Sequence, residues 1–178
     1  MNQEKLWTYI RERAKELNGY SGDGSAFFFL IAAAFIDFLS CATNNAPSCG
    51  DQYKKFIKTR FGKIRAIYQK EGVASAIYCI LRNGLVHNFS FVPVSHGGCS
   101  SWMRSAQGLQ AYLFHVKNGI SAKKHMTISG KCLFIGAEPF ACDIMRVTDE
   151  ILQDKQCAAN ILKWSEQHPP LAPLGFFD

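Results

Sequence analysis

The feature that most constrains the fold is an apolar run of eleven residues, from Ala26 to Ile36, which ends at Asp37. A helix that is apolar on every side is typical of a buried position between other helices or at the seam of a dimer. The run is too short to cross a membrane, because a membrane-spanning helix needs about 20 such residues. We therefore expect a central core helix over 25–42. Asp37 within it needs a partner if it is buried.

The rest of the chain divides into helical and extended patterns. Apolar residues recur at helical spacing in four further segments, namely 2–18, 51–62, 72–87 and 138–167. Residues 95–101 have the composition of a turn. The alternation near Tyr112 and the two short runs joined across Ser129 and Gly130 predict strands.

These patterns predict a mainly α (α+β) fold. A length of 178 residues with 48% hydrophobic residues suits one domain with a sizeable core. We expect a helical bundle with a small antiparallel β-hairpin or sheet inserted before the last long helix. Its parts are a helical core over about 2–90 and 138–167, a β insertion over about 110–136 and an extended C-terminal tail over 168–178.

A guanidinium, an amide and an imidazole lie within six residues at the end of the 72–87 helix, as Arg82, Asn83 and His87. On a regular α-helix Asn83 and His87, four residues apart, share one face. Arg82 lies about 140° around the helix from His87. Arg82 and His87 therefore meet only if the helix ends near Gly84, if Arg82 reaches round, or if a second copy supplies the missing partner.

The run Leu-Arg-Asn-Gly-Leu-Val-His over 81–87 resembles the Arg-x4-6-His signature of the HEPN superfamily, in which Asn commonly follows the Arg. Members of that superfamily are small helical domains, and many are metal-independent ribonucleases of toxin and antiviral systems. The resemblance covers roughly residues 1–90 in pattern, but only the motif is specific. It implies that Arg82, Asn83 and His87 are the catalytic residues and that the protein acts as a homodimer.

The chemistry of these side chains fits RNA cleavage. The ribose 2′-hydroxyl is a nucleophile beside the scissile phosphate, and His87 is suited to proton transfer near neutral pH. Arg82 offers a planar fork to phosphate oxygens, whose charge grows during the reaction. Asn83 would hold either the His87 ring or a phosphate oxygen. We expect no metal and no cofactor. The motif has a single His, whereas the reaction needs both a base and an acid, which also favours a symmetric dimer that brings two motifs together.

A basic segment precedes the motif. Between Lys54 and Lys70 there are seven cations and no acid, and the formal net charge of the chain is +6. Clustered cations attract nucleic acid through its phosphates. The expected RNA-binding residues are Lys54, Lys55, Lys58, Arg60, Lys63 and Arg65. The alternative is an ordinary solvated face.

Cysteine usage and the first residues favour a cytoplasmic protein. Seven scattered cysteines without a CxxC pattern are typical of reduced thiols. His96 and Cys99 supply at most half of a zinc site. The expected partners are RNA, a second copy and an antitoxin or other regulatory protein, with no membrane. Two alternatives stay open: a catalytically silent HEPN-like module that binds RNA, a nucleotide or a protein, and a purely structural dimeric helical protein.

Overall fold

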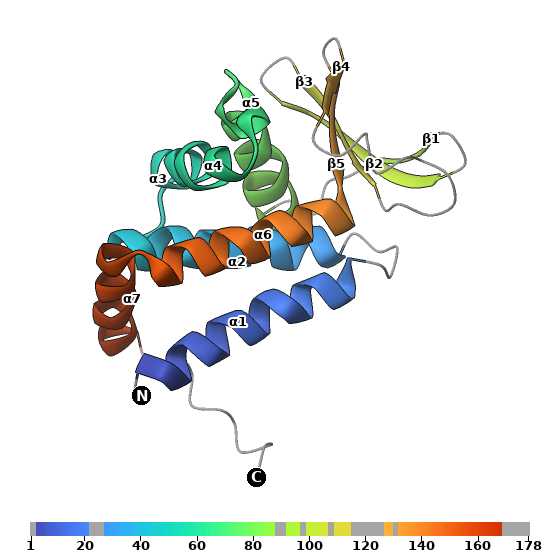
Figure 1. The fold of residues 1–178 in the computed structure, drawn as a ribbon. Helices are drawn as coiled ribbons and strands as arrows, with labels where there is room; N and C mark the ends of the chain where they lie inside the picture. Colours follow the sequence, from blue (N-terminus) through green and yellow to red (C-terminus); the bar gives the residue numbers. More distant parts are fainter. Residues whose placement is uncertain are drawn as a thin grey trace.

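The computed structural model describes residues 3–21, 27–87, 92–96, 99–106, 109–114, 127–129 and 132–168. Within these residues, helices form most of the molecule and a five-stranded sheet lies at one end (Figure 1). The helices up to the sheet are α1 (Gln3–Tyr20), α2 (Phe27–Asn44), α3 (Gly50–Phe56), η1 (Ile57–Phe61), α4 (Gly62–Ile64), η2 (Ala66–Gln69), α5 (Val73–Ile77) and η3 (Tyr78–His87). After the sheet come α6 (Ala137–Gln153) and α7 (Lys155–Gln167). The predicted mainly helical fold, with a small sheet before the last helices, is confirmed.

Helix α2 is the centre of the hydrophobic core, as its uninterrupted apolar run predicts. It packs against α1, α3, η3, α6 and α7, and Phe28, Phe29, Ile36 and Leu39 are completely buried. Burial of one such side chain contributes about 1.5–3 kcal/mol. By length and composition α2 is also long and apolar enough to cross a membrane, but 56% of it is buried inside the protein. This burial favours a core helix.

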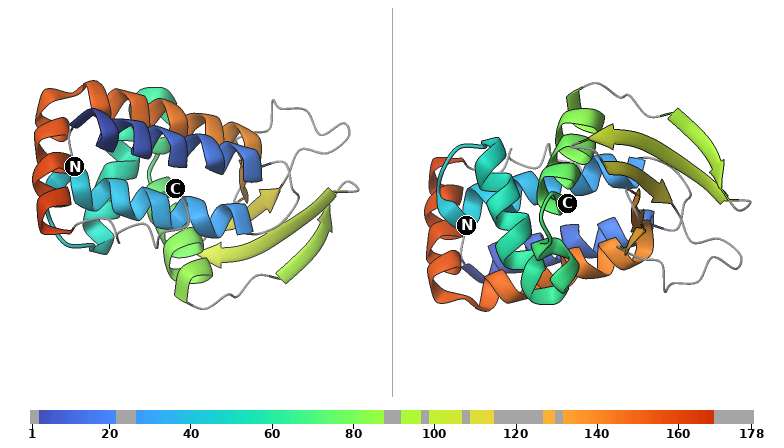
Figure 2. Two further views of the ribbon diagram at one scale, coloured as in Figure 1. Left: turned by 90° about the horizontal axis from the view of Figure 1, so that it is seen from below. Right: turned by 90° about the horizontal axis from the view of Figure 1, so that it is seen from above.

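Helices α1 and α6 lie side by side and cover one side of α2 (Figure 2). Leu6, Ile10, Ala14 and Leu17 form the buried face of α1 at the helical spacing that the sequence shows. The facing side of α6 buries apolar residues in the same pattern, including Phe140, Ile144, Val147 and Ile151. Two amphipathic faces thus close the core.

The predicted long helix over 138–167 is wrong in one respect, because it is broken at Asp154. That residue has extended backbone angles (φ −76°, ψ 111°), and its carboxylate accepts hydrogen bonds from the backbone N–H groups of Gln156 and Cys157. Asp is a favoured residue before the first turn of a helix, and here it starts α7 rather than continuing α6. Helix α7 therefore turns across the end of the bundle and packs on α2 (Figure 1).

The sheet has the order β1-β2-β3-β5-β4. Its strands are β1 (Val92–His96), β2 (Cys99–Ala106), β3 (Leu109–Phe114), β4 (Thr127–Ser129) and β5 (Cys132–Gly136). The expected hairpin is β4–β5, and all pairings are antiparallel except that of β3 with β5. Leu113, Leu133 and Ile135 join the sheet to the helical core.

The sheet is larger than the sequence predicts, since it begins at Val92 instead of near residue 110. Residues 95–101, expected to form a turn, belong largely to the β1–β2 pair, in which Ser95 is opposite Ser100. Their Ser, Gly and Cys composition hides the strand pattern. The expected extended tail lies, from residue 169 on, outside the described residues.

Candidate functional site

The motif lies on a π-helix. Gly72, with a positive φ of 79° that glycine adopts without strain, precedes α5, and from Tyr78 to His87 the helix is of the π type. In a π-helix the hydrogen bonds connect residues five apart, so positions 82 and 87 are one turn apart. The separation of about 140° expected for a regular α-helix is therefore wrong for this segment. The side chain of His87 is outside the described part of the structure.

Asp37 of α2 holds Arg82. The Arg82 Nε donates to Asp37 Oδ2 at 3.0 Å, and Ser48 Oγ donates to Asp37 Oδ1 at 2.7 Å. The side chains of Arg82 and Asp37 are 19% and 18% exposed, so the pair lies at the edge of the core. Asp37 needs a partner if it is buried, and the structure identifies that partner as Arg82, 45 residues further along the chain. Asn83 is half-buried beside Arg82.

Two tyrosine rings join α3 to the start of η3. Tyr53 is completely buried, and its ring centroid lies 5.6 Å from that of Tyr78. Among the described residues, the Tyr53 hydroxyl has no hydrogen-bond partner. Burial and then the negative charge of Asp37 raise the pKa of Tyr53, so it stays protonated. Gly50 permits the close approach of Tyr78, because a Cβ at Gly50 would lie 2.8 Å from the Tyr78 ring.

A neighbouring thiol is unsuited to nucleophilic chemistry. Cys41 of α2 is buried, and burial, followed by the charge of Asp37, raises its pKa to about 11. A thiol acts as a nucleophile only when it ionises, so Cys41 is inert near neutral pH. Arg82, Asn83 and His87 therefore remain the candidate residues for chemistry at this site.

The expected RNA-binding residues divide into two sets. The first set faces the C-terminal helices. Arg60 Nη1 contacts Glu150 at 3.1 Å and Asp154 at 3.0 Å, and Lys63 forms a close ion pair with Glu150. The carboxylates neutralise these cations, so Arg60 and Lys63 join η1 and α4 to α6 and α7.

Arg65 belongs to the same set. Its Nε lies 2.8 Å from Oδ2 of Asp143, a completely buried carboxylate that also accepts a hydrogen bond of 2.9 Å from the Tyr68 hydroxyl. A buried carboxylate needs such partners, because an unpaired buried charge costs several kcal/mol. These pairs are not evident in the sequence, because the carboxylates that pair with Arg60 and Arg65 lie 78–94 residues further along the chain.

The second set lines an open pocket of about 280 Å³. Lys54, Lys55 and Lys58 line it together with Lys70, which follows η2. Lys54 Nζ also pairs with Asp51 at 2.6 Å and lies 5.7 Å from the centroid of the Tyr78 ring. The sequence predicted the first three of these lysines as RNA contacts but not the pocket that they share with Lys70.

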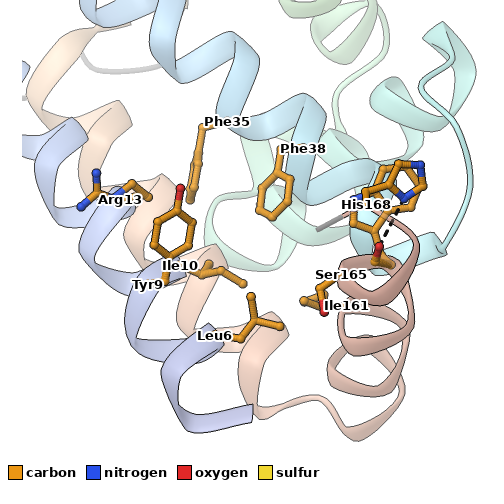
Figure 3. A pocket seen from close by; sticks show the side chains of 10 residues that line it. Leu6, Tyr9, Ile10, Arg13, Phe35, Phe38, Ile161, Ser165 and His168 are labelled. Atoms are coloured by element: carbon orange, nitrogen blue, oxygen red, sulfur yellow. Dashed lines mark hydrogen bonds between the residues drawn. The ribbon is translucent and has the colours of Figure 1, made fainter. Parts of the chain in front are cut away.

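A separate pocket of about 340 Å³ is apolar and lies between α1, α2 and α7 (Figure 3). Tyr9, Phe35 and Phe38 point into it from α1 and α2, and His168 stacks on Trp164 at 3.8 Å on the α7 side. Neither the motif nor the lysines line it. The sequence gives no signal of this pocket, because its wall is made by helices from both ends of the chain.

Within the described residues, no group of three or more His, Cys, Asp or Glu side chains is placed to hold a metal ion. His96 and Cys99 are opposite each other in the β1–β2 pair. No protein-family model matches the chain, and searches of the curated proteins and of the solved structures also give no match. The case for the motif therefore rests on the residues themselves.

Proposed function

We propose that this protein is a metal-independent endoribonuclease of HEPN type that acts on single-stranded RNA through Arg82, Asn83 and His87. The observation that carries the proposal is the π-helix over 78–87, which puts positions 82 and 87 one turn apart. π-Helical turns are rare and are frequently found at functional sites. Asp37 adds a second support, because its ion pair with Arg82 fixes a cation at this turn.

The reaction follows from the groups present. A base removes the proton of the ribose 2′-hydroxyl, whose oxygen attacks the adjacent phosphorus, and an acid protonates the leaving 5′-oxygen. His87 is the proton-transfer group, and Arg82 stabilises charge on the phosphoryl oxygens. The products carry a 2′,3′-cyclic phosphate and a 5′-hydroxyl, and DNA resists because it lacks the 2′-hydroxyl.

A homodimer in the cytoplasm completes the proposal. The single imidazole of the motif, that of His87, supplies one of the two proton-transfer groups, and His87 of a second copy would supply the other. On the π-helix, positions 82 and 87 of one chain are one turn apart, so a second copy is not needed to bring an Arg and a His together. The need for both a base and an acid is what favours a dimer. An antitoxin or another regulatory protein is a further expected partner.

A specific observation favours the second candidate, a catalytically silent HEPN-like module that binds RNA, a nucleotide or a protein. Arg82 already pairs with Asp37, which in turn accepts a hydrogen bond from Ser48. A network of this kind joins η3 to α2 and needs no catalytic role to explain it. In that case Arg82 has a structural role, and the motif would bind without cleaving.

The test is cleavage of single-stranded RNA by purified protein in the presence of EDTA. Wild type should produce 2′,3′-cyclic phosphate ends, while His87→Ala should abolish cleavage and retain RNA binding and the melting temperature. Arg11→Ala is the control, because it removes an exposed ion pair between α1 and Asp149 of α6 and should leave cleavage unchanged. A folded wild type that cleaves no RNA would support the silent module. A dependence on added metal would disprove the mechanism.

A further inference from the structure

The lysine pocket is built from two segments that the fold brings together. Its lining comes from α3 and η1 on one side, and from the residues between η2 and α5 with the first turns of α5 on the other. In Figure 1 the helices α3, α4 and α5 form one group on the side of α2 where η3 also lies. The residues are Lys54, Lys55, Lys58, Thr59, Lys70, Glu71, Gly72, Ala74 and Ser75.

The charge of this pocket favours an anion. Four lysines and a single carboxylate, Glu71, line it. Within the described residues, Lys55, Lys58 and Lys70 have no carboxylate at ion-pair distance, and all three are exposed. Arg60, Lys63 and Arg65 differ from these lysines, because each forms an ion pair with a carboxylate of α6 or with Asp154. The net positive charge of the basic segment is thus concentrated here.

The remaining lining is small and has hydroxyl groups. Gly72, Ala74, Thr59 and Ser75 also line the pocket, and its volume of about 280 Å³ exceeds that of a lone phosphate ion. Pockets of about 300 Å³ and more accommodate small organic ligands. A phosphate together with its sugar therefore suits this pocket better than a free inorganic ion.

The pocket is next to the motif along one continuous helix. α5 lines the pocket and runs directly into η3, so Ser75 and Arg82 are separated by seven residues. The distance along the helix is at most about 10 Å, the length of seven residues at the rise of an α-helix, because the π-helical part rises less per residue. Lys54 lies over the ring of Tyr78, the first residue of η3. Ten ångströms corresponds to about three nucleotides of a stacked strand.

We infer that this pocket holds a backbone phosphate of single-stranded RNA about three nucleotides from the bond that faces the motif. The inference rests on the proposed function. It places the RNA-binding site of that function in the lysine pocket, so the site includes Lys70 and excludes Arg60, Lys63 and Arg65. Lysines act here as point charges on phosphate oxygens, so the pocket positions RNA without selecting a base sequence.

The experiment measures binding apart from cleavage. Fluorescence anisotropy follows a ten-nucleotide 2′-O-methyl RNA, which lacks the nucleophilic hydroxyl, between 50 and 200 mM salt. The test variant is Lys55→Gln with Lys58→Gln and Lys70→Gln. The matched control is Lys15→Gln with Lys155→Gln and Lys163→Gln, which removes the same charge at exposed positions on α1 and α7.

The test variant should weaken binding at least tenfold at 100 mM salt and flatten the slope of log K against log salt by about 2. The control should change affinity less than twofold. Equal weakening by both variants would mean a general charge effect and overturn the inference, as would no weakening at all. Full competition by millimolar inorganic phosphate, with no dependence on oligonucleotide length from three to ten, would also overturn it.

Failure of this inference and failure of the proposed function have different signatures. Because the probe cannot be cleaved, a silent protein would still show the difference between the two variants. Conversely, if wild type cleaves RNA while both variants bind RNA equally well, the proposed function holds and the lysine pocket is not the RNA-binding site.

Discussion

Two buried tyrosine hydroxyls differ in the partners that they find. Tyr68 donates to the buried carboxylate of Asp143, whereas the Tyr53 hydroxyl has no partner among the described residues. An unsatisfied buried hydroxyl costs about 1–3 kcal/mol, while a satisfied one that serves a buried charge stabilises the fold. The two residues therefore form a matched pair in which the same change has opposite effects.

We expect Tyr53→Phe to leave the free energy of unfolding unchanged or to raise it by about 1 kcal/mol. Tyr68→Phe should lower it by about 1–3 kcal/mol, because the buried carboxylate of Asp143 would lose the hydrogen bond from the Tyr68 hydroxyl. Urea unfolding of both variants at pH 7 measures this difference. Destabilisation by Tyr53→Phe of the same size as by Tyr68→Phe would show that the Tyr53 hydroxyl has a partner, such as a buried water.

Among the elements, the break between α6 and α7 depends on one carboxylate. The backbone N–H of Cys157, followed by the side chain of Arg60, lowers the pKa of Asp154 to about 2. Since the pKa in the folded state lies below the ordinary value of 3.8, ionised Asp154 stabilises the fold above pH 4. This contribution disappears as the pH falls from about 4 to about 2.

Asp154→Asn tests this charge while it keeps an oxygen that can cap α7. The variant should be about 1–2 kcal/mol less stable than wild type at pH 7 and equally stable at pH 2. The expected loss is kept this small because the Asp154 side chain is 32% exposed and solvent screens its charge. Urea unfolding at the two pH values measures it. Asp149→Asn, which removes a carboxylate that is 58% exposed, is the control and should change stability by less than about 0.5 kcal/mol. A constant difference at both pH values would contradict the prediction.

Helix positions were predictable from periodicity, but their hydrogen-bond register was not. The apolar faces of α1 and α2 follow from spacing alone, because helix burial repeats along the chain. The π-helix at Tyr78–His87 has no such signature, since the same residues are compatible with a regular helix. The partners of Arg82 and Arg65 depend on tertiary packing, so the sequence could propose the candidate residues but not which of them are already paired.

At the scale of the whole molecule, the number of copies decides how the site is supplied with proton-transfer groups. The sequence allowed α2 at a dimer seam, and in the structure 56% of α2 is buried inside the protein. Tyr9 and Tyr20 of α1 and Phe27, the first residue of α2, remain 43–53% exposed. Light scattering at tens of micromolar should give twice the chain mass of 19.9 kDa. A strict monomer would contradict a site shared between two copies.

Mixed dimers test the shared site more directly. If each cleavage event needs His87 of both copies, as acid and as base, dimers with one His87→Ala subunit are inactive. Wild type and His87→Ala, unfolded together in equal amounts and refolded, should then retain about a quarter of the wild-type rate, because about a quarter of randomly formed dimers are fully wild type. Independent sites would retain about half. Since positions 82 and 87 of one chain are one turn apart on η3, a result of one half would mean that each chain carries a complete site of its own.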